Sequence, residues 1–194
     1  DIRDRERIKR LFAKYGEDIK LIVNAAAQPS HDWSGKFPYE DFEINALGTV
    51  ILLEEMRTQC PKAVFIQCSS SKVYGDAINE NDFIETKKRY ELKHDDKYYN
   101  GFNENLKLDQ SLHSPYGASK WAVNKLTDDL AVKVKNTSVR INTLDPGWLQ
   151  TDLGGPNAHN PVEAVLPGAL APALIEDDGP NGIEFSAIEH DLKL

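Results

Sequence analysis

The chain has 194 residues, a formal net charge of −8, 40% hydrophobic residues and 28% charged residues. This length and composition are typical of one globular domain with a substantial core and leave little room for a second full domain. The acidic balance argues against binding nucleic acid or an anionic membrane through bulk electrostatics.

Targeting and metal signals are weak along the chain. No apolar run approaches the length of a membrane span, and the first ten residues are too charged for a secretory signal, so we expect a cytoplasmic protein. The two cysteines, Cys60 and Cys68, match no metal motif and are expected as buried thiols. The five histidines form no cluster in sequence, so we expect no metal site.

Helix-like and strand-like segments alternate, which predicts an α/β fold: a Rossmann-like, three-layer, doubly wound parallel sheet. The strands at 20–25, 63–68 and 138–144 are expected to be parallel and adjacent in that order. The expected elements in chain order are a helix at 4–15, a strand at 20–25, a helix at 41–59, a strand at 63–68, a helix at 115–136, a strand at 138–144, a short helix near 161–174 and a strand at 182–186.

Segment 76–113 is long, polar and rich in tyrosine. Loops of this length in compact domains are usually functional or disordered. One interpretation is a solvated surface excursion. The other is an insertion that covers a polar substrate, with tyrosines that stack on a sugar or a base.

The heptapeptide SPYGASK, residues 114–120, places Tyr116 and Lys120 on one face of a helix. Ser114 is a good N-cap and Pro115 suits the first helical position, so Tyr116 would lie in the first turn. The helix dipole and the Lys120 ammonium would then favour tyrosinate and make Tyr116 a proton shuttle near neutral pH. The alternative is an amphipathic helix with a surface lysine.

Small and polar residues follow each predicted strand: NAAAQPS at 24–30, SSSKVYG at 69–75 and DPGWLQTD at 145–152. Turn chemistry explains any one of these segments. The carboxyl ends of parallel strands meet at one edge of a sheet, where ligands bind, so together the segments predict a site.

These motifs resemble the short-chain dehydrogenase/reductase superfamily. Residues up to about 130 are similar to its extended branch, the NAD-dependent nucleotide-sugar epimerases and dehydratases, through AAAQPSHDW, CSSSKVYGD and YYNGFNENLKLDQSLHSPYGASK, with CDP-linked deoxyhexoses as the first candidate substrates. The C-terminal stretch RINTLDPGWLQTDLGGPNA instead resembles the single-domain carbonyl reductases. The resemblance implies NAD or NADP as cofactor and the catalytic residues Ser70, Tyr116, Lys120 and Asn45.

The resemblance also implies binding residues. Cofactor contacts would come from the adenine-contacting start of the chain, the loop after the first strand, the catalytic helix and the Pro-Gly turn: Asp1, Ile2, Ala25, Ala26, Ala27, Gln28, Tyr116, Lys120, Pro146, Gly147, Trp148 and Thr151. Substrate contacts would be Pro29, Ser30, His31, Ser71, Tyr99, Asn103 and His113.

The Gly-rich pyrophosphate loop with which the family's fold begins has no counterpart in the chain. We therefore expect a Rossmann-like domain that lacks its first two or three strands, with the strand at 20–25 as an open apolar edge. A complementing chain or a second copy would cover that edge, or the sequence is a fragment.

Two classes of function follow. The first is an NAD(P)-dependent enzyme that acts on a nucleotide sugar by tyrosine-assisted hydride transfer, or alternatively an NADPH-dependent carbonyl reductase that acts on a small carbonyl compound. The second is a non-catalytic fragment or a subunit that needs a complementing chain.

Overall fold

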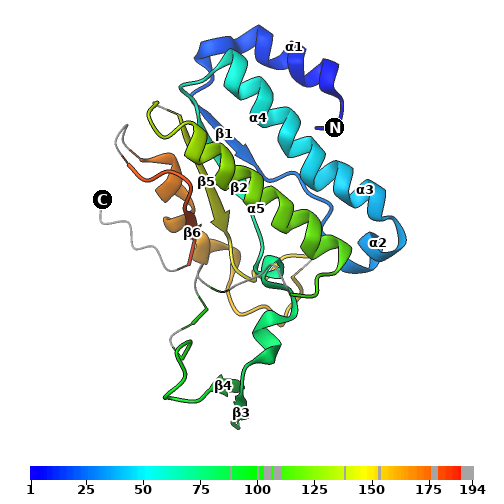
Figure 1. Cartoon of the computed structure of the whole chain (residues 1–194), viewed down its shortest axis with the longest axis vertical. Helices are drawn as coiled ribbons and strands as arrows, with labels where there is room; N and C mark the ends of the chain where they lie inside the picture. The colour runs from blue at the N-terminus through cyan, green and yellow to red at the C-terminus, as the bar shows by residue number, and fades with distance from the viewer. Residues whose placement is uncertain are drawn as a thin grey trace.

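A parallel sheet in the order β1-β2-β5-β6 forms the centre of the fold (Figure 1). The computed structural model describes residues 1–87, 89–99, 101–102, 106, 111–137, 139–152, 154–175 and 179–188. The expected order and parallel pairing of the first three strands are confirmed, and the last strand pairs with β5 in the same sense. The strands are β1 (Leu21–Asn24), β2 (Val64–Cys68), β5 (Arg140–Asp145) and β6 (Glu184–Ser186).

Apolar side chains pack on both faces of this sheet. On one face, Phe65 of β2 and Ile141 of β5 join a core that α1 (Arg5–Tyr15), α4 (Gly48–Gln59) and α5 (Pro115–Lys133) complete. On the other face, Ile66, Leu144 and Phe185 pack with Ala171 from the 3-10 segment η5 (Gly168–Ala173). The alternation of neighbours Phe65 and Ile66 between the two cores follows from the two-residue repeat of a strand.

Local signals explain where the helices begin and end. Asp4 caps α1 by accepting a hydrogen bond from the Arg7 amide, and Ser114 caps α5 by accepting one from the Gly117 amide. The helix expected at 41–59 begins earlier, as α3 (Pro38–Phe42), and continues through a π-helical segment, η2 (Glu43–Leu47), into α4. The helix expected at 115–136 ends at Lys133.

The expected helix at 161–174 is replaced by two 3-10 segments, η4 (Val162–Val165) and η5. Pro167 lies between them and Pro172 lies inside η5. Neither proline has an amide hydrogen to donate, so a regular α-helix cannot continue through them. Elements that were not predicted are η1 (Gly16–Asp18), α2 (His31–Lys36), η3 (Ser71–Glu80), β3 (Phe83–Glu85) and β4 (Tyr90–Leu92).

The segment between β2 and α5 leaves the body of the domain. After η3, β3 and β4 form an antiparallel hairpin that extends away from the sheet in Figure 1. Among the described residues, β1 has a strand partner on one side only, and Leu21 and Val23 are 44% and 54% exposed. The apolar edge expected at this strand is therefore present.

No helix among the described residues is both long and apolar enough to cross a membrane. The same residues contain no group of three or more His, Cys, Asp or Glu side chains that could hold a metal ion.

Candidate active site

The loops that follow β1, β2 and β5 line one cleft of about 630 Å³ at the carboxyl edge of the sheet. Its lining includes two of the predicted catalytic residues, three of the predicted substrate residues and, besides Tyr116, four of the predicted cofactor residues. These are Ser70 and Tyr116; Pro29, His31 and Ser71; and Pro146, Gly147, Trp148 and Thr151.

Tyr116 lies at the centre of this arrangement. It lines the cleft together with Ser70, which acts on the pKa of the phenol, and its ring lies 4.7 Å from the imidazole of His31, centroid to centroid. The Lys120 ammonium is 5.9 Å from the same ring centroid, and Lys120 is buried behind the cleft. The three side chains of the predicted triad are therefore neighbours, on β2, η3 and α5 or next to them.

The expected tyrosinate is wrong for this structure. Burial raises the pKa of Tyr116, the hydrogen bond from Ser70 lowers it, and the negative charge of Asp41 raises it again. Desolvation of the phenolate is the largest influence on this pKa, because Tyr116 is only 8% exposed. The raised pKa favours the protonated phenol over tyrosinate in this structure.

Lys120 is also shaped by burial. Desolvation lowers the pKa of Lys120, whereas Cys68 and Asp41 act to raise it. Burial also raises the pKa of the Cys68 thiol, and the charge of Lys120 lowers it. The alternative of a solvated surface lysine is excluded, since Lys120 is 4% exposed.

Gly117 explains why η3 can lie so close to α5. A Cβ atom at Gly117 would lie 2.9 Å from the backbone oxygen of Lys72, closer than real Cβ atoms approach. Only glycine therefore allows the segment that carries Ser70 to approach the first turn of α5.

Asn45 holds three parts of the site together from the π-helical segment η2. Its Oδ1 accepts a hydrogen bond from the Gln28 amide at 2.8 Å, and its Nδ2 donates to the Ser119 hydroxyl at 2.9 Å. Nδ2 also lies 3.2 Å from Asp41 Oδ1. π-Helical turns are often found at functional sites, and this one directs the Asn45 side chain toward both the loop after β1 and α5.

A buried polar network supports Asn45 and was missed by sequence reasoning. Asn24 donates to Thr49 Oγ1 at 3.0 Å and to Gln67 Oε1 at 2.8 Å, while Thr49 donates to the Asn45 carbonyl at 2.8 Å. Asn24 and Gln67 are also register partners on β1 and β2. The signal for this network was a polar residue near the end of each of two otherwise apolar strands.

Several predicted binding residues lie outside the cleft. The side-chain amide of Gln28 donates hydrogen bonds to Asp41 and to the Ser30 backbone oxygen, and Ser30 caps α2. Both ring nitrogens of His113 face backbone oxygens, of Ser111 at 2.9 Å and Val73 at 2.8 Å. Tyr99 stacks on His94 instead. Asn103 lies outside the described residues.

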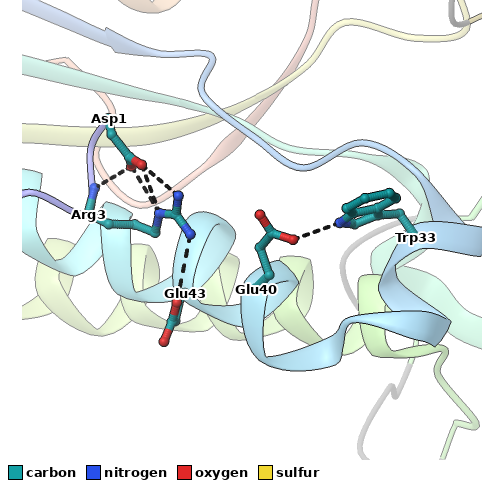
Figure 2. Close-up of polar contacts among 5 residues, drawn as sticks. All are labelled: Asp1, Arg3, Trp33, Glu40 and Glu43. Carbon is teal, nitrogen blue, oxygen red and sulfur yellow. Dashed lines mark hydrogen bonds and ion pairs between the residues drawn. The ribbon is translucent and has the colours of Figure 1, made fainter.

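Asp1 and Ile2, which were predicted to contact the adenine, do not line this cleft. Figure 2 shows the Asp1 carboxylate bonded to the Arg3 guanidinium, which also lies 3.8 Å from Glu43 of η2. Ile2 packs against the core beside α4. Ala25, Ala26 and Ala27 directly follow β1 and are partly or fully exposed. Their contacts with a cofactor stay predictions.

Comparison with known proteins identifies the family. A model of the NAD dependent epimerase/dehydratase family matches residues 1–144. CDP-paratose 2-epimerase from Salmonella typhi is 36% identical over 160 residues, which cover 77% of this chain and 45% of that protein. The chain thus spans less than half the length of this curated relative.

Solved structures have the same fold. A short-chain dehydrogenase/reductase from Burkholderia multivorans with bound NADP superposes with a TM-score of 0.65 at 20% identity, covering 100% of this chain and 75% of that one. UDP-glucose-4-epimerase from Stenotrophomonas maltophila, with bound NAD and formylated UDP-arabinopyranose, gives a TM-score of 0.54 at 25% identity, covering 77% and 36%. The chain belongs to the NAD dependent epimerase/dehydratase family.

Proposed function

We propose that this chain carries the catalytic centre of an NAD(P)-dependent epimerase that acts on a nucleotide sugar, with a CDP-linked deoxyhexose as the first substrate to test. The observation that carries the proposal is that Ser70 and Tyr116 line one cleft where three strand-end loops meet. The similarity to CDP-paratose 2-epimerase supports the choice of sugar nucleotide.

The residues present fit the nicotinamide end of the cofactor. Gly147, with φ of 75°, turns the chain after β5 and directs Pro146, Trp148 and Thr151 into the cleft. Hydroxyls of Ser70, Tyr116 and Thr151 are hydrogen-bonding groups suited to a carboxamide and a ribose. In this proposal Lys120 and Tyr116 contact that ribose, and Pro146 to Thr151 hold the nicotinamide.

Each catalytic side chain has a separate task. Ser70 holds the reacting sugar oxygen by a hydrogen bond. Tyr116 donates its phenolic proton to that oxygen when it is a keto oxygen, and takes the proton from it when it is a hydroxyl and Tyr116 is tyrosinate. The bound nicotinamide supplies the hydride chemistry at the adjacent carbon. Asn45 positions the loop after β1 relative to the first turns of α5 through its hydrogen bonds.

A carbonyl reductase is the second candidate. The observation that favours it is the apolar lining of the cleft, to which Trp148 and Leu149 contribute together with Tyr116. A small hydrophobic carbonyl compound could use these side chains, whereas described residues of 76–113 do not line the cleft. The covering role of that segment over a sugar therefore stays a prediction.

Calorimetry on the full natural protein separates the two. In the first experiment, the protein is loaded with oxidised cofactor and titrated with CDP. In the second, the protein is given reduced cofactor and assayed for reduction of small aromatic ketones. Saturable CDP binding without ketone reduction is expected. Ready ketone reduction without CDP binding would exclude the epimerase, and failure to bind either dinucleotide would favour the non-catalytic alternative.

A further inference from the structure

Asp41 of α3 is a fully buried carboxylate beside the candidate active site, with an exposed fraction of 0%. Its Oδ1 accepts hydrogen bonds from Gln28 Nε2 at 2.7 Å and from Asn45 Nδ2 at 3.2 Å. One oxygen of Asp41 therefore contacts both the loop after β1 and the π-helical segment.

The other oxygen of Asp41 is not satisfied. Oδ2 is buried and has no hydrogen-bond partner among the described residues. A buried, incompletely paired carboxylate costs several kcal/mol in folding stability. An apolar or amide side chain at this position would avoid that cost, so the charge itself calls for an explanation.

The charge of Asp41 acts on the two central residues of the site. Burial is the main influence on Tyr116 and raises its pKa, and Asp41 raises that pKa further. Burial lowers the pKa of Lys120, and Asp41 opposes this shift. Both effects have the sign of a nearby negative charge, which disfavours phenolate and favours ammonium.

A series of hydrogen bonds also connects Asp41 to the backbone of Tyr116. Asn45 Nδ2 donates to Ser119 Oγ, and Ser119 Oγ donates to the backbone oxygen of Tyr116 at 2.9 Å. Asp41, Asn45 and Ser119 thus form a buried chain of contacts from α3 to the first turn of α5. Tyr116 is therefore affected both by these hydrogen bonds and by the charge of Asp41.

We propose that Asp41 is a positioning residue of this active site, whose carboxylate fixes the amides of Gln28 and Asn45 and whose negative charge acts on Lys120 and Tyr116. The inference rests on the proposed function for the roles of Tyr116 and Lys120. It differs from a purely structural role, in which Asp41 would hold the loop after β1 with no influence on proton equilibria.

Other titratable groups also face Tyr116 or Lys120. Among the described residues they are His31 of α2, Cys68 of β2, Lys72 of η3 and Asp145 of β5. The test must therefore change only the charge of Asp41. Asp41→Asn does so with the same shape, and Glu40→Gln is a matched control on the same helix. Glu40 accepts a hydrogen bond from Trp33 at 2.9 Å (Figure 2), which a glutamine oxygen can still accept.

The experiment is an NMR titration of the protein with 13C at tyrosine Cζ, with the Tyr116 resonance assigned from Tyr116→Phe. In Asp41→Asn we expect the Tyr116 midpoint to fall by about one pH unit, because a nearby negative charge is removed. Glu40→Gln should leave it unchanged. An unchanged midpoint in Asp41→Asn, or an equal shift in Glu40→Gln, would overturn the charge role.

Asp41→Glu tests the anchoring role and keeps the proposal falsifiable if Asp41→Asn does not fold. It retains the charge on a longer side chain, so the Tyr116 midpoint should stay near the wild-type value while the Gln28 backbone and side-chain amides exchange with solvent faster. Unchanged exchange in this variant would overturn the anchoring role. Neither readout requires substrate or cofactor, so failure of this inference is distinct from failure of the proposed function.

Discussion

The side-chain amide of Asn45 donates a 2.9 Å hydrogen bond to the hydroxyl of Ser119, although 74 positions separate the two residues. Both side chains are buried, and the Ser119 hydroxyl in turn donates to the carbonyl of Tyr116. The position of the candidate catalytic tyrosine therefore depends on a residue of the π-helical segment that it does not touch.

Removal of this hydroxyl should destabilise the fold. Ser119→Ala removes the shortest bond of Asn45 Nδ2 and leaves it the longer contacts with Gln28 O at 3.3 Å and Asp41 Oδ1 at 3.2 Å. The free energy of unfolding should therefore fall by about 0.5–1.5 kcal/mol, the usual net value of one hydrogen bond. Ser34→Ala is the control, because Ser34 is equally buried but bonds only to the His31 carbonyl of its own helix. Urea denaturation measures both. Equal losses in the two variants would show that the Asn45 contact adds nothing.

Loss of the phenolic oxygen should remove the proton transfer but not the fold. In the full natural protein, Tyr116→Phe is expected to lower kcat by about 10² to 10⁴, the usual contribution of a general acid or base. Tyr15→Phe, at an exposed tyrosine of α1 outside the cleft and outside segment 76–113, should retain full activity. A Tyr116→Phe enzyme with wild-type kcat would exclude Tyr116 as the proton donor.

Ser70 should lower the pH at which Tyr116 ionises. Burial raises the pKa of Tyr116 and the Ser70 hydrogen bond opposes that rise, so Ser70→Ala should raise the pKa further. Tyrosinate then forms only at higher pH, and any step that takes a proton from a sugar hydroxyl moves to higher pH with it. The 13C tyrosine titration checks the sign against Ser71→Ala, a neighbouring serine in the same cleft. A shift to lower pH in Ser70→Ala contradicts the assignment.

The buried ammonium of Lys120 should lower the free energy of unfolding at pH values where it is protonated. Its pKa is lowered in the folded state, chiefly by burial, so folding loses free energy wherever Lys120 carries its proton. Stability then rises with pH between the folded pKa and the higher pKa of the unfolded lysine. Lys120→Met should therefore raise the free energy of unfolding at neutral pH by about 1 kcal/mol, and the gain should shrink as the pH approaches that of free lysine.

The control for Lys120→Met lies five residues along the same helix. Lys125 is exposed and forms an ion pair with Asp129 at 2.5 Å, so Lys125→Met should change stability by no more than about 0.5 kcal/mol. Denaturation at several pH values tests both variants. A clear loss of stability in Lys120→Met would mean that its partners outweigh its burial.

Periodicity and strand-end chemistry predicted the sheet and much of the cleft from sequence. The apolar runs around Ile22, Phe65 and Ile141 had no competing interpretation, and parallel strands necessarily bring the residues that follow them to one edge. The N-cap at Ser114 and the proline at 115 likewise determined the start of α5. Local signals sufficed where the responsible residues are neighbours in sequence.

The parts that sequence reasoning missed depend on distant residues. The π-helical turn that directs Asn45 is a small deviation within a regular helical pattern, and nothing in DFEIN marks Asp41 as fully buried. The pKa of Tyr116 was expected to fall because of its place in the first helical turn and its neighbour Lys120. Burial raises it instead, and burial is a property of the folded chain that the local sequence does not show. The 3-10 segments near Pro167 and Pro172 could have been foreseen from the prolines themselves.

The balance of reduced nicotinamide during turnover distinguishes an epimerase from a carbonyl reductase. The full natural protein is mixed with oxidised cofactor and a CDP-linked deoxyhexose, and the absorbance of reduced nicotinamide is followed together with product stereochemistry. We predict that the sugar is epimerised with no net accumulation of reduced cofactor, and that Tyr116→Phe abolishes the conversion. Stoichiometric consumption of reduced cofactor with a small ketone, and no epimer from any nucleotide sugar, would contradict the account.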